Sequence, residues 1–193
     1  MKTRDIFDSL SPIDYRYWHE EVAKYLSENA NIRYQFLMEL ALVRALHRRG
    51  ICPEAAVKEV EAVCGQVTTE EVYEEEDRIW HNIRALVNCI RDKVSDAAKP
   101  YVHMTATSYD IIDSANAARY KDVIEKVLIP SLTKLEESLI DITLREAETV
   151  QIGRTHGQHA VPITFGFALA EYVSRLGGSI KALGVFAKEL PGK

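Results

Sequence analysis

The sequence predicts an all-α protein, with an N-terminal helical domain followed by the long helices of a bundle. Apolar residues recur at helical spacing along almost the whole chain, and no convincing stretch shows the period of two that a half-buried strand requires. Only 9 glycines and 6 prolines interrupt the 193 residues. An apolar share of 47% and a charged share of 27% are typical of a globular chain, so disorder is not expected.

The first long helix is predicted from its two ends. Ser27 precedes the helical pattern and is a favoured N-cap residue, while Gly50 follows it and is a favoured stop. Arg48 and Arg49 complement the negative end of the helix dipole. The apolar stripe of this helix consists of Ile32, Phe36, Leu40 and Val43.

Two shorter helices are expected next. Pro53 fits the first turn of one, and Thr69, which two glutamates follow, begins the other. The acidic run at residues 74–77 is interpreted as a solvated face of the second helix.

A short non-helical segment follows Pro100 and extends to about Ser108. It separates the expected N-terminal domain, residues 1–104, from the expected partial bundle, residues 105–193.

Two long helical patterns occupy the second domain. One starts near Ser108 and is expected to break or kink near Pro130, and the other starts near Thr164. Gly177 and Gly178 lie within the second pattern and should together cost about 2 kcal/mol relative to alanine, so another helix is expected to approach closely there.

These helices are too long for the chain to cover by itself. A helix of about thirty residues spans roughly 45 Å, so its apolar stripe requires partners. The chain also ends at Lys193 directly after a helical pattern, and it is therefore expected to be a fragment of a larger protein.

Composition excludes several classes of function. The net charge is −5 with acids and bases interspersed, whereas a nucleic-acid-binding protein would cluster its lysines and arginines. Cys52, Cys64 and Cys89 form neither a disulfide framework nor a zinc motif, which favours a reducing cytoplasm. The sequence shows no signal peptide and no apolar run of about 18 residues, so we expect a soluble protein without a membrane partner.

Residues 153–162, with the sequence GRTHGQHAVP, carry the densest group of reactive side chains, in a turn between two helical patterns. His156 is a candidate general acid because imidazole exchanges a proton near neutral pH. A polar helix connection without chemistry is the alternative. A metal site of His156 and His159 is not expected, because no carboxylate of a known metal motif accompanies them.

Residues 103–110 place hydroxyl side chains directly before a predicted helix. The exposed amides of a helix N-terminus bind anions, so Thr107 and Ser108 are candidate carboxylate ligands. Thr107 and Asp110 also have the spacing of a capping box, and the sequence alone favours that structural interpretation.

Two further segments carry candidate residues. His81 is suited to orient or charge-balance His156, and the alternative is a helix histidine half-buried beside Trp80. Arg16, next to Tyr17, is suited to bind a phosphate, although a surface arginine is the commoner explanation. No phosphate-binding glycine loop or dinucleotide fingerprint is present, and no cofactor is expected.

Taken together and in this order, the segments at residues 11–17, 81–82, 103–110 and 153–158 resemble the fumarase and aspartase superfamily of fumarate-releasing lyases. Within it they resemble most the adenylosuccinate lyase family. The resemblance implies a carbon–nitrogen lyase of purine biosynthesis that eliminates fumarate and takes a purine nucleotide as its small-molecule substrate. It also implies a homotetramer with active sites shared among subunits.

The resemblance also implies roles for single residues. His156 would protonate the leaving nitrogen with assistance from His81, and Thr107 and Ser108 would hold a carboxylate of the succinyl group. The remaining residues implied in substrate binding are Arg16, Tyr17 and His103 at the phosphate, together with Asn82 and Gln158. The serine that serves as base would lie beyond Lys193, so this chain alone is expected to show little or no activity.

Two positions depart from the family pattern: Asn82 replaces a common aspartate, and His159 replaces a common proline. Argininosuccinate lyase and the carboxymuconate cycloisomerases fit the motifs less well, since the former would show a more basic loop at Thr107 and the latter tryptophan in place of His156. A noncatalytic helical oligomerisation module is the alternative from another functional class.

Overall fold

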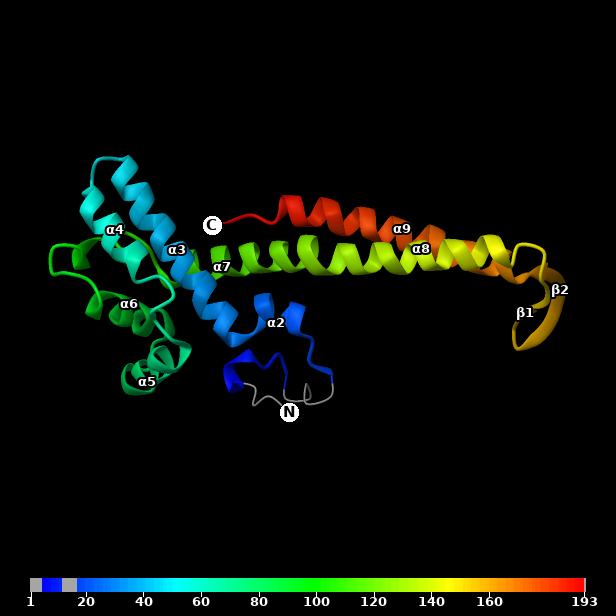
Figure 1. Ribbon diagram of the computed structural model, residues 1–193, viewed down its shortest axis with the longest axis horizontal. Coiled ribbons are helices and arrows are strands. Elements are labelled where there is room, and N and C mark those ends of the chain that lie inside the picture. Colours follow the sequence, from blue (N-terminus) through cyan, green and yellow to red (C-terminus); the bar gives the residue numbers. More distant parts are fainter. Residues whose placement is uncertain (1–4, 12–16, 193) are drawn as a thin grey trace. The chain divides into compact units, whose positions relative to one another are not determined.

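The computed structural model describes residues 5–11 and 17–192, and these residues are mostly helical, which confirms the all-α fold class (Figure 1). The chain divides into two compact units. The first comprises residues 1–122 and 190–193, and the second comprises residues 123–189. The predicted domain boundary between residues 104 and 105 stays a prediction.

The first unit is built from short helices around one long helix. In chain order its elements are η1 (Ile6–Asp8), α2 (Glu20–Leu26), α3 (Glu28–Arg48), α4 (Glu54–Ala62), α5 (Thr69–Ile79), α6 (Asn82–Asp92), η2 (Lys99–Tyr101) and α7 (Ser108–Val123).

The predicted ends of α3 are confirmed. The Ser27 hydroxyl accepts a hydrogen bond from the amide of Ala30 at 3.2 Å, and the chain leaves the helix through Gly50, whose φ of +73° suits glycine. Thr68, one residue before the predicted start of α5, is its N-cap and forms a capping box with Glu71.

The acidic run in α5 is only partly a solvated face. Glu74 and Asp77 are exposed, but Glu75 is partly buried and accepts hydrogen bonds from Arg78 and from Asn88 on α6. Part of the run therefore joins α5 to α6.

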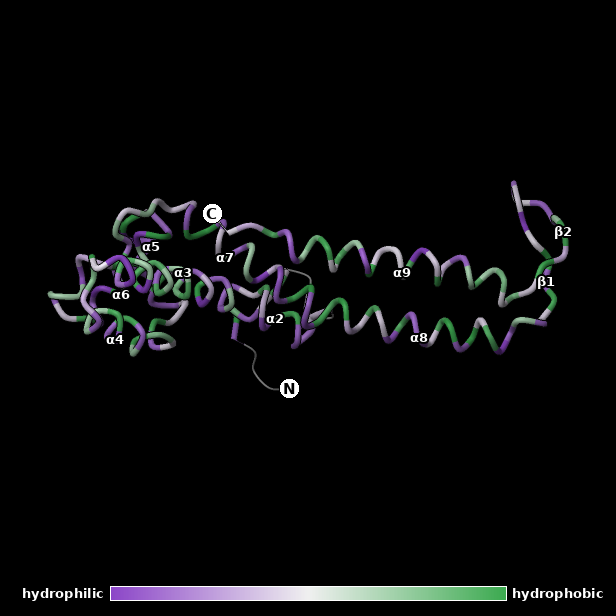
Figure 2. The backbone as a smooth tube through the Cα atoms, turned by 90° about the horizontal axis from the view of Figure 1, so that it is seen from above, coloured by the Kyte–Doolittle hydropathy of each residue, from purple (hydrophilic) through white to green (hydrophobic). Residues whose placement is uncertain are grey.

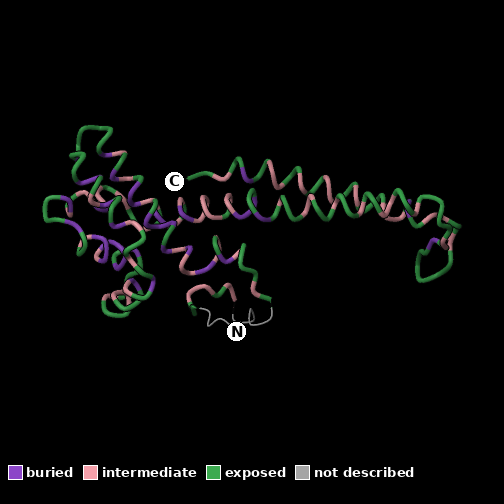
Figure 3. The backbone as a smooth tube through the Cα atoms, in the orientation of Figure 1, coloured by how far each residue is buried: buried purple, intermediate pink, exposed green. Residues whose placement is uncertain are grey.

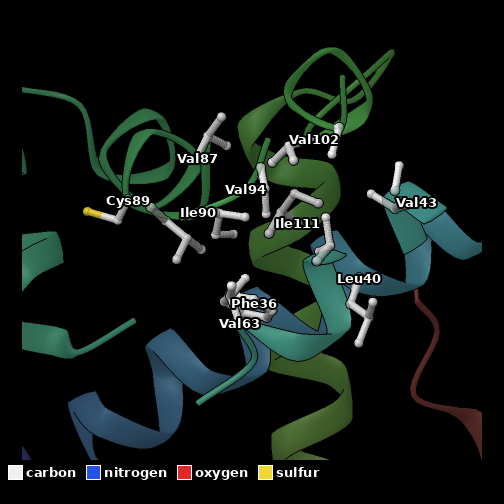
Figure 4. Packing of buried hydrophobic residues seen from close by; sticks show 14 of the residues in the cluster. Phe36, Leu40, Val43, Val63, Val87, Cys89, Ile90, Val94, Val102 and Ile111 are labelled. Atoms are coloured by element: carbon white, nitrogen blue, oxygen red, sulfur yellow. The ribbon is translucent and has the colours of Figure 1, made fainter. Parts of the chain in front are cut away.

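The hydrophobic core of the first unit lies among α3, α4, α6 and the start of α7 (Figures 3 and 4). Phe36, Leu40 and Val43 of the predicted stripe are all buried, as is Ile32. They pack with apolar side chains that include Val60, Leu86, Ile90 and Ile111.

The three cysteines are free thiols, in agreement with the sequence prediction of no disulfide framework. Cys52 and Cys89 are buried and Cys64 is partly buried. Burial raises the pKa of the Cys89 thiol to about 11, so this thiol stays protonated and unreactive at neutral pH.

The second unit is a helical hairpin closed by a small sheet. It contains a π-helical segment, η3 (Ile124–Leu128), then α8 (Ile129–Arg145), β1 (Val150–Thr155), β2 (Gln158–Thr164) and α9 (Phe165–Glu189). Figures 1 and 2 both show α9 running alongside α8. The sequence predicts a break or kink near Pro130, and the structure has a change of helix type there: the π segment ends at Leu128, and Pro130 lies in the first turn of α8.

The expectation of no strand is wrong at residues 150–164, which form an antiparallel β-hairpin. Most side chains of both strands are exposed or partly buried on either face, so no core imposes the alternation that sequence analysis relies on. The register shifts at Gly153, which is buried and lies close to the Val161 carbonyl. A Cβ at position 153 would lie 2.7 Å from that oxygen.

The predicted close approach of another helix to the glycine pair of α9 is confirmed for Gly177 but not for Gly178. A Cβ on Gly177 would lie 2.5 Å from a carboxylate oxygen of Glu136 in α8, whereas one on Gly178 would meet nothing within 4 Å. Gly166, the second residue of α9, lies even closer to its neighbours, since a Cβ there would collide with the Thr143 carbonyl and lie 2.8 Å from the Ala147 backbone.

The second unit buries few side chains within this chain. No residue of α8 is buried, and only Gly166 and Ala187 of α9 are, although apolar residues recur along both helices (Figure 2). Large apolar side chains that remain exposed include Leu135, Leu144, Phe167, Tyr172, Val185 and Phe186. This agrees with the prediction that the long helices need partners.

The apolar stretches of these helices are not suited to cross a bilayer. Across residues 5–11 and 17–192, every helix is too short or too polar to span one.

Gly166→Ala is expected to destabilise the protein by about 1–3 kcal/mol, because the added methyl group overlaps the backbone at the end of α8. Gly178→Ala is the matched control in the same helix, and it should stabilise by about 1 kcal/mol since its methyl group meets no neighbour. Urea unfolding followed by circular dichroism measures both. Equal effects of the two substitutions would contradict the packing at Gly166.

Candidate functional site

His81 lies between α5 and α6 rather than inside a helix. Trp80 ends α5 in the left-handed conformation with φ of 59° and is 91% exposed. His81 then has extended backbone, is exposed, and accepts the amide N–H of Arg84 on Nδ1 at 3.2 Å. The interpretation of a half-buried helix histidine beside Trp80 is therefore wrong, because the turn at Trp80 points both side chains away from the core.

This capping role fixes the chemistry that His81 can perform. Nδ1 acts as an acceptor and so carries no proton, which leaves Nε2 as the ring nitrogen with the proton. Asn82, the first residue of α6, turns its Oδ1 to the amide of Ile83 at 2.7 Å. The His81–Asn82 pair thus forms the exposed N-terminus of α6, where the helix dipole favours negative charge.

His103 lies in the turn before α7 and is tied to the core. Its Nδ1 is 2.6 Å from Oε1 of Glu39, a residue in the middle of α3. His103 has φ of 63° and Thr105 has φ of 69°, so two residues of this turn adopt a conformation that is costly for side-chain-bearing residues.

Of the two hydrogen bonds in the capping box predicted for Thr107 and Asp110, the structure confirms the one from the Thr107 amide to the Asp110 side chain. The Thr107 amide and hydroxyl both donate to Oδ2 of Asp110, at 2.8 and 2.9 Å. The Thr107 hydroxyl is therefore a donor here. Ser108 is the first residue of α7 and is partly buried. Anion binding by Thr107 and Ser108 stays a prediction.

His156 and Gln158 flank the tip of the β-hairpin in the second unit. Thr155 pairs with Gln158, so His156 and Gly157 form a two-residue turn, and both have positive φ, 49° and 72°. This is the pattern of a type I′ turn, which the sequence His-Gly followed by a strand signals weakly. Both His156 and Gln158 are exposed.

The remaining predicted residues have little structural context. Tyr17 is 76% exposed, and Arg16 lies outside the described residues. Among residues 5–11 and 17–192, no group of three or more histidine, cysteine, aspartate or glutamate side chains is placed to hold a metal ion.

The structure brings some of these residues into contact with others. His81 and Asn82 share the start of α6, and Thr107 contacts Asp110 at the start of α7. The sequence analysis missed Glu39, which contacts His103 across 64 positions of sequence. Its only sequence signal is a charged residue on the apolar stripe between Phe36 and Leu40.

Comparison with known proteins gives matches over nearly the whole chain. The model of the lyase family matches residues 3–190. The chain is 39% identical over 165 residues to the adenylosuccinate lyase of Archaeoglobus fulgidus, covering 86% of this chain and 36% of that protein. It is 33% identical over 177 residues to the adenylosuccinate lyase of Methanocaldococcus jannaschii, covering 91% and 38%.

Solved structures give a concordant result. The crystal structure of 3-carboxy-cis,cis-muconate lactonizing enzyme from Pseudomonas putida superposes with a TM-score of 0.85 at 26% identity, covering 93% of this chain and 42% of that one. The chain therefore spans less than half the length of the proteins that it matches.

His81→Ala is expected to destabilise the first unit by about 1 kcal/mol, because the amide of Arg84 loses its cap. His81→Asn should restore most of that loss, since asparagine is among the best N-cap residues. Thermal unfolding of the three proteins measures the effect. Equal losses in both variants would contradict a capping role.

Proposed function

This chain belongs to the lyase family, and from that premise we propose that the protein of its complete reading frame is an adenylosuccinate lyase. The observation that carries the proposal is identity of 33–39% to several archaeal proteins named adenylosuccinate lyase. The reaction would be β-elimination of fumarate from adenylosuccinate, giving AMP, and from the succinylated aminoimidazole carboxamide ribotide.

His156 is proposed as the general acid. It would protonate the nitrogen as the carbon–nitrogen bond breaks, after a base has removed the proton beside a carboxylate. Its place at an exposed, strained hairpin tip supports this role, since residues held in the left-handed conformation recur at active sites. His81 would assist through Nε2, because Nδ1 is occupied by the helix cap.

Residues from several segments would hold the substrate. Thr107 and Ser108 at the start of α7 would bind a carboxylate of the succinyl group, and the Thr107 hydroxyl would exchange its bond to Asp110 for one to the substrate. Tyr17 and His103 would bind the phosphate. Asn82, Arg16 and Gln158 complete the proposed substrate contacts.

The apolar side chains exposed on α8 and α9 support assembly, and we propose a homotetramer in which these helices pack against other subunits. Free thiols, all three with a pKa raised by burial, are consistent with a reducing cytoplasm as the location. The two expected domains, residues 1–104 and 105–193, remain part of the proposal.

Fumarate release from adenylosuccinate tests the proposal, measured with the protein of the complete reading frame. His156→Ala is expected to lower kcat by about 100- to 10,000-fold, the usual contribution of a general acid. His159→Ala is the matched control, since His159 is an exposed histidine of the same hairpin. It should retain nearly full activity.

The two possible failures are distinct. An assembled wild-type protein that releases no fumarate from either purine substrate would contradict the proposed substrate. An active His156→Ala variant would contradict only the assignment of the acid.

A further inference from the structure

Glu39 is a buried carboxyl group whose position in the hydrophobic core is expected to lower the stability of the fold. It lies in the middle of α3 with no exposed surface, at a position that helical spacing puts on the same face as Phe36, Leu40 and Val43. Figure 4 shows these three apolar residues in the core. Burying a carboxyl group in such surroundings is costly unless its oxygens find partners. An apolar side chain of similar size would fit this position at lower cost.

The partners of Glu39 are incomplete. Oε1 contacts Nδ1 of His103 at 2.6 Å, while Oε2 is buried and has no hydrogen-bond partner in the part of the chain that the structure describes. A carboxylate placed to stabilise the fold would have both oxygens satisfied. The one contact that Glu39 does make is therefore the feature that needs an explanation.

The His103 side chain, unlike Glu39, is partly exposed. The His103 side chain is 19% exposed, and Glu39 occupies Nδ1, which leaves Nε2 as the nitrogen for a ligand. The backbone of His103 is strained, and the same turn leads within four residues to Thr107. A fixed ring at this point would present a defined nitrogen beside the proposed substrate ligands.

We propose that Glu39 is a positioning residue for His103. Its buried carboxylate accepts the Nδ1–H of His103, which fixes the ring orientation and assigns the proton to Nδ1. Nε2 is then the nitrogen that meets the substrate. The identity of that ligand as a nucleotide phosphate rests on the proposed function, but the geometry of the pair does not.

This arrangement explains why the charge is kept in the core. A phosphate oxygen is an acceptor, so His103 would take up a second proton from solvent when a phosphate binds, and would donate to the phosphate from Nε2 while donating to Glu39 from Nδ1. The ring would then carry a positive charge between two anions, and the carboxylate behind it would balance that charge. An apolar residue at position 39 would pack equally well but could not hold the Nδ1 proton.

Histidine tautomers measured by nitrogen NMR on this chain test the proposal without any activity. His103 is expected to carry its proton on Nδ1, as is His47, whose Nδ1 lies 2.8 Å from the carbonyl oxygen of Cys52 and must donate to it. His81 is expected to show the opposite tautomer, because its Nδ1 accepts an amide N–H. The two serve as internal references.

Two substitutions then separate positioning from packing. Glu39→Met removes the acceptor and should move the His103 proton to Nε2, whereas Glu39→Gln keeps an acceptor oxygen and should preserve the Nδ1 proton. Glu39→Met should not lower the thermal unfolding midpoint, since an apolar side chain leaves no unpaired polar group in the core. Tyr34→Phe is the matched control, because it removes the hydrogen bond from α3 to Asp122 without touching His103.

Kinetics of the complete enzyme provide a second measurement. Glu39→Met should raise KM for adenylosuccinate about tenfold with little change in kcat, the size expected for weakening one hydrogen bond to a charged group. Glu39→Gln should recover most of that loss, and Tyr34→Phe should leave KM unchanged.

The outcomes that overturn the proposal are specific. An Nε2 proton on His103 in the wild type, or an Nδ1 proton that persists in Glu39→Met, would show that Glu39 does not set the tautomer. Loss of stability or failure to fold in Glu39→Met would show that the pair is structural. Failure of the lyase activity alone would leave the NMR result standing and would contradict only the proposed function.

Discussion

Helix capping, which satisfies the first amide groups of a helix, accounts for several of the polar residues of this chain. Ser27 and Thr68 provide ordinary hydroxyl caps for α3 and α5. At α6 the cap is an imidazole, and at the start of α7 the Asp110 carboxylate accepts the amide and the hydroxyl of Thr107. The last two are also the positions where the family resemblance implies substrate contacts. Capping groups of this kind face solvent at the positive end of a helix, so the same geometry serves an anionic ligand.

Backbone strain marks the same places. Among the described residues, four without glycine's freedom have positive φ: Trp80, His103, Thr105 and His156. Each lies in, or directly beside, a segment that the sequence analysis selected for its chemistry. Strain of this kind costs of order 1–3 kcal/mol per residue and persists only where surrounding structure holds it. The backbone strain therefore lowers local stability at positions where the proposed active site needs side chains to point in particular directions.

The features that sequence analysis predicted well are local ones. Ser27, Gly50 and the change of helix type near Pro130 follow from the chemistry of single residues, and the stripe of α3 follows from a core on one side only. The β-hairpin was missed because its strands have no core face to impose alternation. The turn at Trp80 could not be predicted, because apolar residues on both sides of it keep the spacing of one continuous helix. Glu39 and His103 are 64 positions apart, and no local pattern predicts such a pairing.

The two units are stabilised in different ways, which affects how the proposed chemistry is controlled. The first unit has its own core and holds His81, His103 and Thr107 on elements that this core fixes. The second unit holds His156 on a hairpin between helices whose apolar side chains remain exposed in this chain. Burial of those side chains by other subunits would contribute roughly 25 cal/mol for each Å² removed from water, so the acid loop would gain its rigidity from assembly. The substrate contacts proposed in the first unit would then depend on the fold of that unit, whereas proton transfer by His156 and the contact proposed for Gln158 would depend on assembly.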